Sequence, residues 1–258
     1  MCVDDLVCVG AAPLFFLDYL AVGRLDPDAV EGLVSGIAAG CIEAGCALIG
    51  GEMAEHPGVM ATDQFDLVGF AVGAVERDGV LDGSAAVVGD VLVGIESPNL
   101  RSNGFSLARR LVFDVAGHDL DDPAWEGAAT TLADELLDPS VIYAPAVVAA
   151  LAHHEVHAVA HVTGGGLPGN LPRVMNDRLD AVVDCSTWEV PRIFRELQAM
   201  GDVSDDEMDR VFNMGLGMVL VVPAVDVDGV LATLAAHDRS ARVVGELVTG
   251  SGQVRMES

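Results

Sequence analysis

The residues best suited to chemistry form one glycine-rich segment, HVTGGGLPGN, which runs from His161 to Asn170. An apolar stretch precedes Thr163 and three successive glycines, and a helical pattern follows them. Three glycines cost backbone entropy, so they indicate positive φ angles or close approach of a ligand to the main chain. Amide groups in such a turn, ahead of a helix, form an anion site. We interpret the segment as a phosphate cradle, with a plain strand-to-helix turn as the alternative.

A second turn, RSNGFS at Arg101 to Ser106, also lies between a predicted strand and a predicted helix. Ser102 and Asn103 can donate side-chain hydrogen bonds there, and Arg101 can pair with a phosphate. An Asn-Gly turn that starts a helix explains the same residues without any ligand. Taken alone, this turn is therefore the weaker of the two signals.

Four carboxylates stand in conspicuous surroundings: Asp4 and Asp5 near the start, and Glu52 and Glu55 in GGEMAEHPG. Mg²⁺ prefers oxygen ligands and often bridges one or two carboxylates to substrate phosphates. Glu52 follows two glycines, so we expect it to be held in a turn rather than on a solvated helix face. Because the chain has 40 Asp and Glu residues, an ordinary surface charge is the alternative for each of the four.

Histidines 153, 154, 157 and 161 resemble a metal cluster at first sight. No cysteine and no His pair spaced four residues apart on one helix completes a zinc set, so the first three are interpreted as structural. His161 stays open because it adjoins the glycines.

Helices and strands alternate along the chain. The clearest helix runs from Pro27 to Cys46, where apolar residues recur every three or four positions and Asp26 suits the cap. Covered strands are predicted at 66–76 and 90–96, with a Gly- and Asp-rich connection between two domains lying between them. Further helices are predicted at 124–137, 145–154, 167–175, 191–200 and 227–236, and further strands at 158–162, 179–184, 217–222 and 242–247. This alternation predicts an α/β fold of helices layered on sheets.

Composition excludes several classes of function. The 258 residues include 40 acidic and 13 basic side chains, a formal charge of −27, and every base is arginine. Such a charge repels nucleic acid and anionic lipid, and no apolar run reaches the length of a membrane span. Five cysteines without a CxxC pair favour reduced thiols in the cytoplasm. The acid excess favours a halophilic source, whereas a GC-rich genome would explain the missing lysine alone.

Five segments together resemble one enzyme family, the phosphoribosylformylglycinamidine cyclo-ligases or aminoimidazole ribonucleotide synthetases. In order, they are CVDDLVCVGAAPLFFLDYLAVGRLDP, CALIGGEMAEHPG, RSNGFSLAR, HVTGGGLPGNLPRV and FNMGLGM. The likeness extends from Met1 to about Val254, and the first block together with TGGGLPGNLPR is highly specific.

The resemblance implies a two-domain α/β fold and an enzyme of purine biosynthesis. Residues 1–79 would be part of an N-terminal nucleotide-binding domain that pairs in a homodimer, and residues 80–258 a C-terminal α/β domain that closes the active site. The family uses ATP and Mg²⁺ to cyclise formylglycinamidine ribonucleotide, releasing ADP and phosphate. Such an enzyme must orient two parts of one substrate and stabilise charge on phosphate.

Carried over position by position, the resemblance implies a set of site residues. Asp5 and Glu52 would be magnesium and nucleotide ligands, and His161 is the catalytic candidate. The remaining ligand-binding candidates are Gly50, Gly51, Ser102, Asn103, Gly104, Thr163, Gly164, Gly165, Gly166 and Asn170.

The chain also departs from the family pattern. Asp4 stands where Asn is usual, Met53 where Thr is usual, Arg101 where His is usual, and Ser140-Val141 where Thr-Arg is usual. Losing an Arg at position 141 would alter phosphate recognition, for which Arg101 is a candidate compensation.

The chain further lacks about a quarter of the family's length at its start, including a glycine-rich nucleotide loop and a lysine-bearing segment. We therefore expect a truncated gene product that is inactive and prone to associate on its own. Another ATP-using relative, of the thiamine-phosphate kinase or selenophosphate synthetase type, and a non-catalytic fragment are the alternatives.

Overall fold

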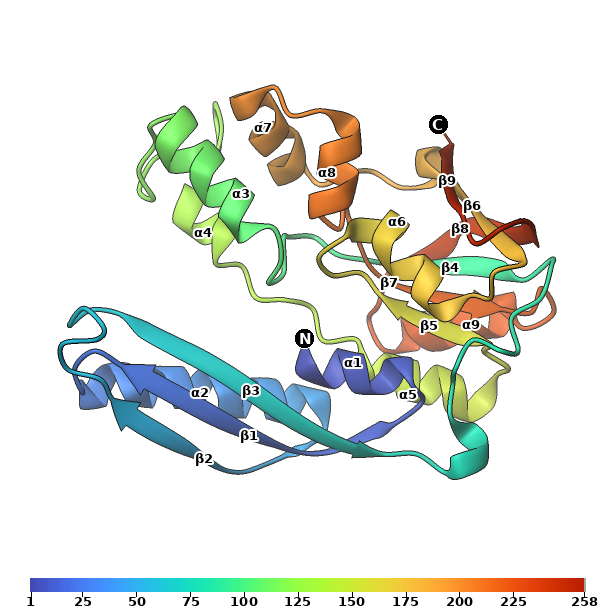
Figure 1. Cartoon of the computed structure of the whole chain (residues 1–258), viewed down its shortest axis with the longest axis horizontal. Coiled ribbons are helices and arrows are strands. Elements are labelled where there is room, and N and C mark those ends of the chain that lie inside the picture. The colour runs from blue at the N-terminus through green and yellow to red at the C-terminus, as the bar shows by residue number, and fades with distance from the viewer. Residues whose placement is uncertain (258) are drawn as a thin grey trace. The chain divides into compact units, whose positions relative to one another are not determined.

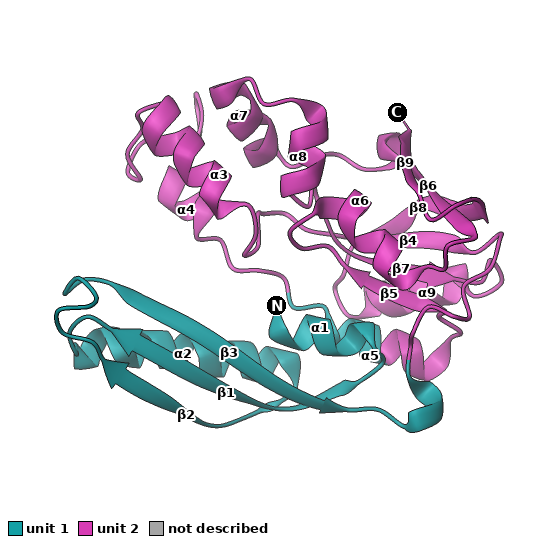
Figure 2. Cartoon of the chain, viewed as in Figure 1, with its two compact units in different colours: residues 1–80, 142–148 teal, residues 81–141, 149–258 magenta. Residues whose placement is uncertain are grey.

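The computed structural model describes residues 1–257, and these form two compact units (Figure 1, Figure 2). Unit 1 comprises residues 1–80 and 142–148, and unit 2 comprises residues 81–141 together with the chain from 149 onward. Each unit contains one β-sheet and several helices, so the α/β class is confirmed. None of the described helices combines the length and the apolar composition that a bilayer span requires.

Unit 1 is built on a three-stranded sheet in the order β2-β1-β3. The central strand β1 (Ala12–Val22) runs parallel to β2 (Ala47–Glu55) and antiparallel to β3 (Phe65–Ala74). The crossover from β1 to β2 is α2 (Pro27–Ala44), since parallel strands need a long connection. Asp26 caps α2, as predicted, by accepting hydrogen bonds from the next helical N–H groups.

Two expectations for unit 1 are wrong. The strand over 66–76 was expected to be covered on both faces, but β3 is largely exposed, with Phe70 at 62% and Val68 at 49%. Glu52 was expected in a turn, but β2 continues as a strand through both glycines to Glu55. In each case the expectation rested on the residue types within the segment. Its structure depends instead on contacts outside the segment, above all on pairing with β1.

Unit 2 is built on a six-stranded sheet in the order β5-β7-β4-β8-β6-β9. Its strands are β4 (Val91–Glu96), β5 (Ala158–His161), β6 (Leu179–Asp184), β7 (Leu216–Val222), β8 (Ala241–Thr249) and β9 (Val254–Glu257). Every residue of β7 is buried, and β4 beside it is nearly so. The core therefore lies on these central strands, which fixes the loops at their ends.

The helices of unit 2 follow the predictions at most positions. They are α3 (Phe105–Arg109), which continues as a π-helical turn (Arg110–Val115), α4 (Leu132–Leu136), α6 (Gly166–Asn170), α7 (Arg192–Gly201), α8 (Asp205–Val211) and α9 (Val227–Ala236). A further helix, α5 (Ala144–His153), is shared between the two units. The helix predicted over 124–137 is wrong, because only its last turn, α4, is helical. The sequence patterns also gave no sign of α1 (Cys2–Cys8), β1, α8 or β9.

A histidine–carboxylate pair joins the segments that lead into β4 and β5, the two strands on either side of β7. Asp90, buried at the start of β4, accepts hydrogen bonds from Val87 N at 2.9 Å and from His157 Nδ1 at 2.7 Å. The other ring nitrogen of His157 lies 3.2 Å from Glu155 Oε1. Burial lowers the pKa of His157, but the hydrogen bonds to Asp90 and Glu155 outweigh it, so the net pKa is raised.

We therefore expect the pair to stabilise unit 2 more in mild acid than in mild base. A raised histidine pKa adds stability that is complete below the unfolded-state pKa and is lost as the pH rises through the folded-state value. Asp90→Asn should lower the free energy of unfolding by roughly 1–3 kcal/mol near pH ~5.5, and by less near pH ~8.5. Urea unfolding followed by Trp125 and Trp188 fluorescence measures this, and Glu155→Gln, which removes the exposed carboxylate of the same network, should show the same pH dependence at a smaller size. Equal losses at both pH values would contradict the assignment.

Candidate functional site

Three loops of unit 2 meet beside the core strands, and two of them carry predicted site residues. A Cβ atom built on Gly164 would lie 3.7 Å from Asn103 Nδ2, so the Ser-Asn-Gly loop borders the glycine turn. A Cβ atom on Gly104 would lie 2.4 Å from the ring of Phe212, at the end of α8. Gly104 also has a positive φ of 82°. Only glycine fits this position, because both the space and the backbone angle exclude a side chain.

The glycine turn itself is shaped by contact with α8. Gly165 and Gly166 have φ angles of 103° and 59°, and a Cβ atom on Gly166 would lie 1.7 Å from Asp209 O. The close packing of main chain on main chain explains one of the three glycines without any ligand. Gly164 is different: it is exposed, and the space around it is open apart from Asn103.

Asn170 and Thr163 hold the turn from within. Asn170 Nδ2 donates to Gly166 O at 2.7 Å and to Thr163 O at 3.3 Å, and Thr163 Oγ1 donates to Asn170 Oδ1 at 3.3 Å. The predicted helix after the turn is short, since α6 has five residues and passes into a 3₁₀ turn. Within the described chain, the amide groups of Gly164 and Gly165 donate to no carbonyl, so they are the groups open to an anion.

The loop that carries Ser102 and Asn103 is fixed by a buried neighbour, Asn99. Asn99 Nδ2 donates to Asp138 Oδ2 at 2.7 Å and to Pro139 O at 2.9 Å, while its Oδ1 accepts from Arg101 N at 3.0 Å. The main-chain oxygen of Asn99 accepts from Asn213 Nδ2 at 2.9 Å. One residue therefore ties together the β4–α3 loop, the segment after α4 and the α8–β7 loop.

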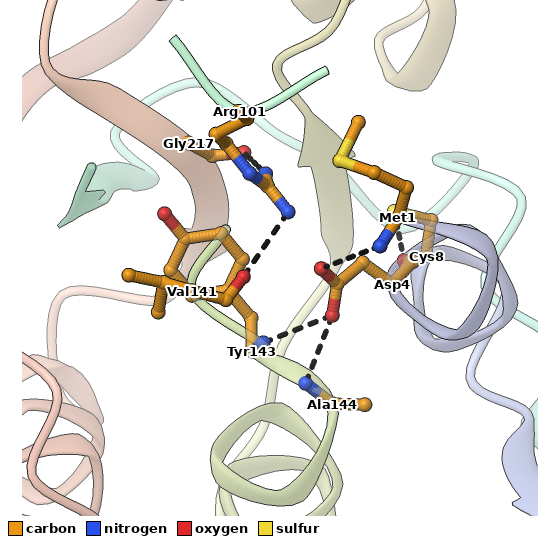
Figure 3. A network of polar contacts seen from close by, with 8 residues as sticks. All are labelled: Met1, Asp4, Cys8, Arg101, Val141, Tyr143, Ala144 and Gly217. Atoms are coloured by element: carbon orange, nitrogen blue, oxygen red, sulfur yellow. Dashed lines mark hydrogen bonds and ion pairs between the residues drawn. The ribbon is translucent and has the colours of Figure 1, made fainter. Parts of the chain in front are cut away.

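Arg101 is buried in the same region rather than directed at solvent. Its backbone is left-handed, with φ 62°, and its side chain is 6% exposed. The guanidinium donates to Gly217 O at 3.1 Å and to Val141 O at 3.3 Å (Figure 3). The side chain of Arg101 thus links the start of β7 to Val141, the position where the family usually has an arginine.

The remaining unit 2 candidates differ in exposure. Ser102 is exposed, Asn103 is half-buried, and His161 is buried at the last position of β5, in register with Met218 of β7. Asn103 borders the glycine turn through Nδ2, His161 precedes the turn by two residues, and Ser102 is the most exposed of the three.

The two adjacent acids of unit 1 have different surroundings. Asp4 is fully buried, and its Oδ1 accepts from Tyr143 N at 2.9 Å and from Ala144 N at 3.1 Å (Figure 3). These N–H groups begin α5, so Asp4 acts as a helix cap supplied from another segment. Asp5 is exposed on α1. The carboxylate that faces solvent is therefore the one that the resemblance selected.

The GGE segment lies on β2, away from α1. Gly51 is opposite Asp18 of β1, and a Cβ atom on Gly51 would lie 1.6 Å from Asp18 Oδ1, so glycine makes room for that carboxylate. Gly50 precedes it on the same strand. Glu52 is exposed beside Tyr19, and its carboxylate accepts from Met53 N at 2.9 Å. No group of three or more His, Cys, Asp or Glu side chains in residues 1–257 is arranged to hold a metal ion.

Sequence reasoning missed the residues that organise the site. Asn99, Asp138 and Asn213 make the contacts that position the loops, yet no local motif marked the first two. Asn213 lies within FNMGLGM, where a polar residue next to an apolar strand was an available signal. Long-range hydrogen bonds of this kind leave no periodic pattern in the sequence.

Comparisons with known proteins agree over nearly the whole chain. Residues 1–75 match the family described as "AIR synthase related protein, N-terminal domain", and residues 87–257 match its C-terminal domain. The chain is 48% identical over 247 residues to a phosphoribosylformylglycinamidine cyclo-ligase of Geotalea daltonii, covering 96% of this chain and 71% of that one. It is 46% identical over 252 residues to the enzyme of the same name from Bacillus velezensis, covering 98% and 72%.

Solved structures share the fold at lower identity. The hydrogenase maturation protein HypE superposes with a TM-score of 0.71 at 20% identity, covering 99% of this chain and 76% of that chain. Thiamine-monophosphate kinase from Stenotrophomonas maltophilia gives 0.69 at 23% identity, covering 98% and 75%. A HypE structure in complex with ATP gives 0.69 at 18% identity, covering 99% and 73%.

We expect Asn99→Ala to destabilise unit 2, because it leaves Asp138, Pro139 and the main chain of Arg101 without their buried partner. The free energy of unfolding should fall by roughly 2–4 kcal/mol, as is typical when a buried polar network is broken. Asn103→Ala is the matched control: in the described chain its amide makes no hydrogen bond, so stability should change by less than about 0.5 kcal/mol. Urea unfolding followed by tryptophan fluorescence distinguishes the two. Similar losses in both variants would refute the special role of Asn99.

Proposed function

Because the chain belongs to the phosphoribosylformylglycinamidine cyclo-ligase family, we propose that it closes the imidazole ring of formylglycinamidine ribonucleotide with ATP, as an enzyme of purine biosynthesis. The structural observation that carries the proposal is the meeting of two loops, with Asn103 3.7 Å from a Cβ position on Gly164. These are the loops that a nucleotide or a phosphorylated substrate would contact.

The reaction requires activation of an amide oxygen. The γ-phosphoryl group of ATP is transferred to the formamide oxygen, which releases ADP and turns that oxygen into a phosphate leaving group. The amidine nitrogen then attacks the formyl carbon, the carbon–oxygen bond breaks, and phosphate departs as the ring closes. Because both reacting groups belong to one substrate, the protein contributes chiefly orientation and charge stabilisation.

Residues of unit 2 can supply both the orientation of the substrate and the stabilisation of charge. The open amides of Gly164 and Gly165 can donate to phosphate oxygens, and Asn103 can donate from the adjoining loop. His161 is the proposed proton carrier or loop-orienting group, since it is the titratable side chain two residues before Thr163. Thr163 and Asn170 hold the turn in shape, so we propose that they act by positioning it.

Magnesium is a separate part of the proposal. Carboxylates suit Mg²⁺, but Asp5 on α1 and Glu52 on β2 lie on different elements, and the described residues form no cluster of metal ligands. Residues 1–257 of one chain therefore do not form a site that would hold Mg²⁺ through protein ligands alone. We propose that Mg²⁺ enters as the counter-ion of the nucleotide, with Asp5 or Glu52 as single carboxylate contacts.

A related kinase activity is the second candidate, because thiamine-monophosphate kinase shares the fold. At 23% identity that likeness shows architecture alone, whereas the cyclo-ligases are 46–48% identical over nearly the whole chain. We therefore favour ring closure.

The protein should convert formylglycinamidine ribonucleotide and ATP into aminoimidazole ribonucleotide, ADP and phosphate. Chromatography of both products tests this, with a chelator added in a parallel reaction to test the need for Mg²⁺. The net charge of −27 supports our further proposal of a high-salt source, so the assay is run at low and at molar salt. Phosphorylation of thiamine phosphate without ring closure would overturn the assignment.

We further propose that unit 1 forms a homodimer through the open face of its sheet. Leu17, Tyr19, Val68 and Phe70 share this face by strand register, whereas α1 and α2 pack on the opposite face, against Phe16. A contiguous apolar sheet face of this kind marks an interface. A second copy of the chain is the occupant we propose, because two such faces are complementary under two-fold symmetry.

Placing a charge on this face should weaken the dimer. Phe70→Glu should shift the sedimentation coefficient from dimer to monomer, because association would bury an unpaired carboxylate. Ile42→Glu is the matched control: Ile42 is 80% exposed on α2, outside the proposed interface, so its substitution should leave the oligomeric state unchanged. A wild-type monomer at micromolar concentration, or dissociation by both variants alike, would refute the proposal.

A further inference from the structure

Two cysteines lie at the end of α2 in a geometry set by the main chain. Gly45 has a φ of 70°, its N–H donates to Ile42 O at 3.2 Å, and Cys46 N donates to Cys41 O at 3.0 Å. This is a Schellman motif, in which the residues at the positions of Cys41 and Cys46 bring their side chains into contact. Here the contact that is usually apolar is made by two thiols.

The spacing of the two Cα atoms lies within the reach of a disulfide. With the Cys46 N–H bonded to Cys41 O, the two Cα atoms are no more than about 7 Å apart, which is the upper limit for a bridge. The side chains also face the same space: Cys41, Cys46 and Cys2 line an apolar cavity of about 190 Å³, together with Phe16 and Ile37. All five cysteines of the chain are free thiols in this structure.

We propose that Cys41 and Cys46 form a reversible disulfide, making the end of α2 a site of oxidation by low-molecular-weight disulfides. Cys46 is partly exposed and Cys41 is 6% exposed, so Cys46 reacts first with the external disulfide and Cys41 reacts second. The bridge closes a six-residue ring that joins α2 to the start of β2, the strand that carries Gly50, Gly51 and Glu52. The proposal does not depend on the proposed closure of the imidazole ring of the substrate.

The chemistry is two successive thiol–disulfide exchanges. The Cys46 thiolate attacks one sulfur of glutathione disulfide, which forms a mixed disulfide and releases one glutathione thiolate. The Cys41 thiolate then attacks the Cys46 sulfur, the mixed bond breaks, and a second glutathione leaves. In sum, two protein thiols lose two hydrogens and one glutathione disulfide gains them.

The second exchange should be slow near neutral pH. Burial, followed by the neighbouring Cys46 and Asp18, raises the pKa of Cys41 to about 11. The groups that face this thiol are Cys46 on the turn and Asp18 on β1, and the same cavity is lined by Cys2 on α1 and by Met1, which carries the terminal amino group. Because only thiolate attacks, closure should accelerate about tenfold per pH unit between pH ~7 and ~9.

The sequence offers a clean readout of the bridge. Since the chain has no lysine, trypsin cuts after Arg24 and next after Arg77, and the peptide between them contains Cys41 and Cys46 alone among the cysteines. The reduced native chain is treated with glutathione disulfide, quenched with iodoacetamide and digested with trypsin, and the peptides are analysed by mass spectrometry. If the bridge has closed, Cys41 and Cys46 carry no alkyl or glutathione group, and the peptide has the mass of its reduced form minus two hydrogens.

We expect closure to be favoured at least about tenfold more in the native chain than in the chain unfolded in guanidinium, because the helix end holds the thiols together. This comparison needs no variant, so it stands even if a substitution disturbs folding. The proposal is overturned if the native chain stops at a glutathione adduct, remains unmodified, closes no better than the unfolded chain, or links this peptide to the one that contains Cys2.

Three variants assign the roles. Cys41→Ser should accumulate glutathione on Cys46, and Cys46→Ser should leave the buried Cys41 unmodified over the same time. Cys185→Ser, which lies in unit 2, is the matched control and should close like the wild type. Glutathione on Cys41 in the Cys46→Ser variant, at the wild-type rate, would contradict the proposed order of exchange.

Discussion

The buried side chain of Asn99 is the interaction on which the site of unit 2 depends. An amide has two donors and an acceptor in one plane, and Asn99 uses them on Asp138, Pro139 and the main chain of Arg101. Groups of this kind are costly to bury without partners and rigid when satisfied. The Ser-Asn-Gly loop therefore has a defined position before any ligand binds, which is what an enzyme that acts by orientation requires.

The rest of unit 2 supports that position through its sheet. The central strands β4 and β7 are almost fully buried, and two of the loops of the site adjoin their ends, whereas the glycine turn follows β5. Packing in such a core leaves little freedom, because voids and overlaps both cost free energy. The glycine turn then needs no side chains of its own, since α8 shapes it from outside and Asn170 from inside.

Unit 1 has the opposite character. Its sheet has three strands and one covered face, and large apolar side chains such as Phe70 are exposed. A small sheet with one open apolar face buries little of its own surface, so its stability is linked to whatever covers that face. The two units therefore differ in kind, since unit 2 has a closed core and unit 1 has a sheet with one exposed apolar face.

The sequence by itself determined the elements with strong local patterns and the identity of the glycine-rich loops. The helix capped by Asp26, the strand at 179–184 and the helix at 227–236 all follow from the spacing of apolar residues and from capping, which are properties of neighbours in the chain. Family membership was also readable, because short motifs preserve residue types in order.

Only the tertiary structure decided which of two adjacent aspartates is buried, that β3 is open, and that Asn99 connects three loops. Asp4 and Asp5 are identical in composition, and their difference arises because the N–H groups that begin α5 lie beside one of them. Contacts between residues more than a hundred positions apart depend on how strands pair and helices pack. Local sequence patterns do not encode that pairing, so the partners of Asp4 and Asn99 became visible only in the folded chain.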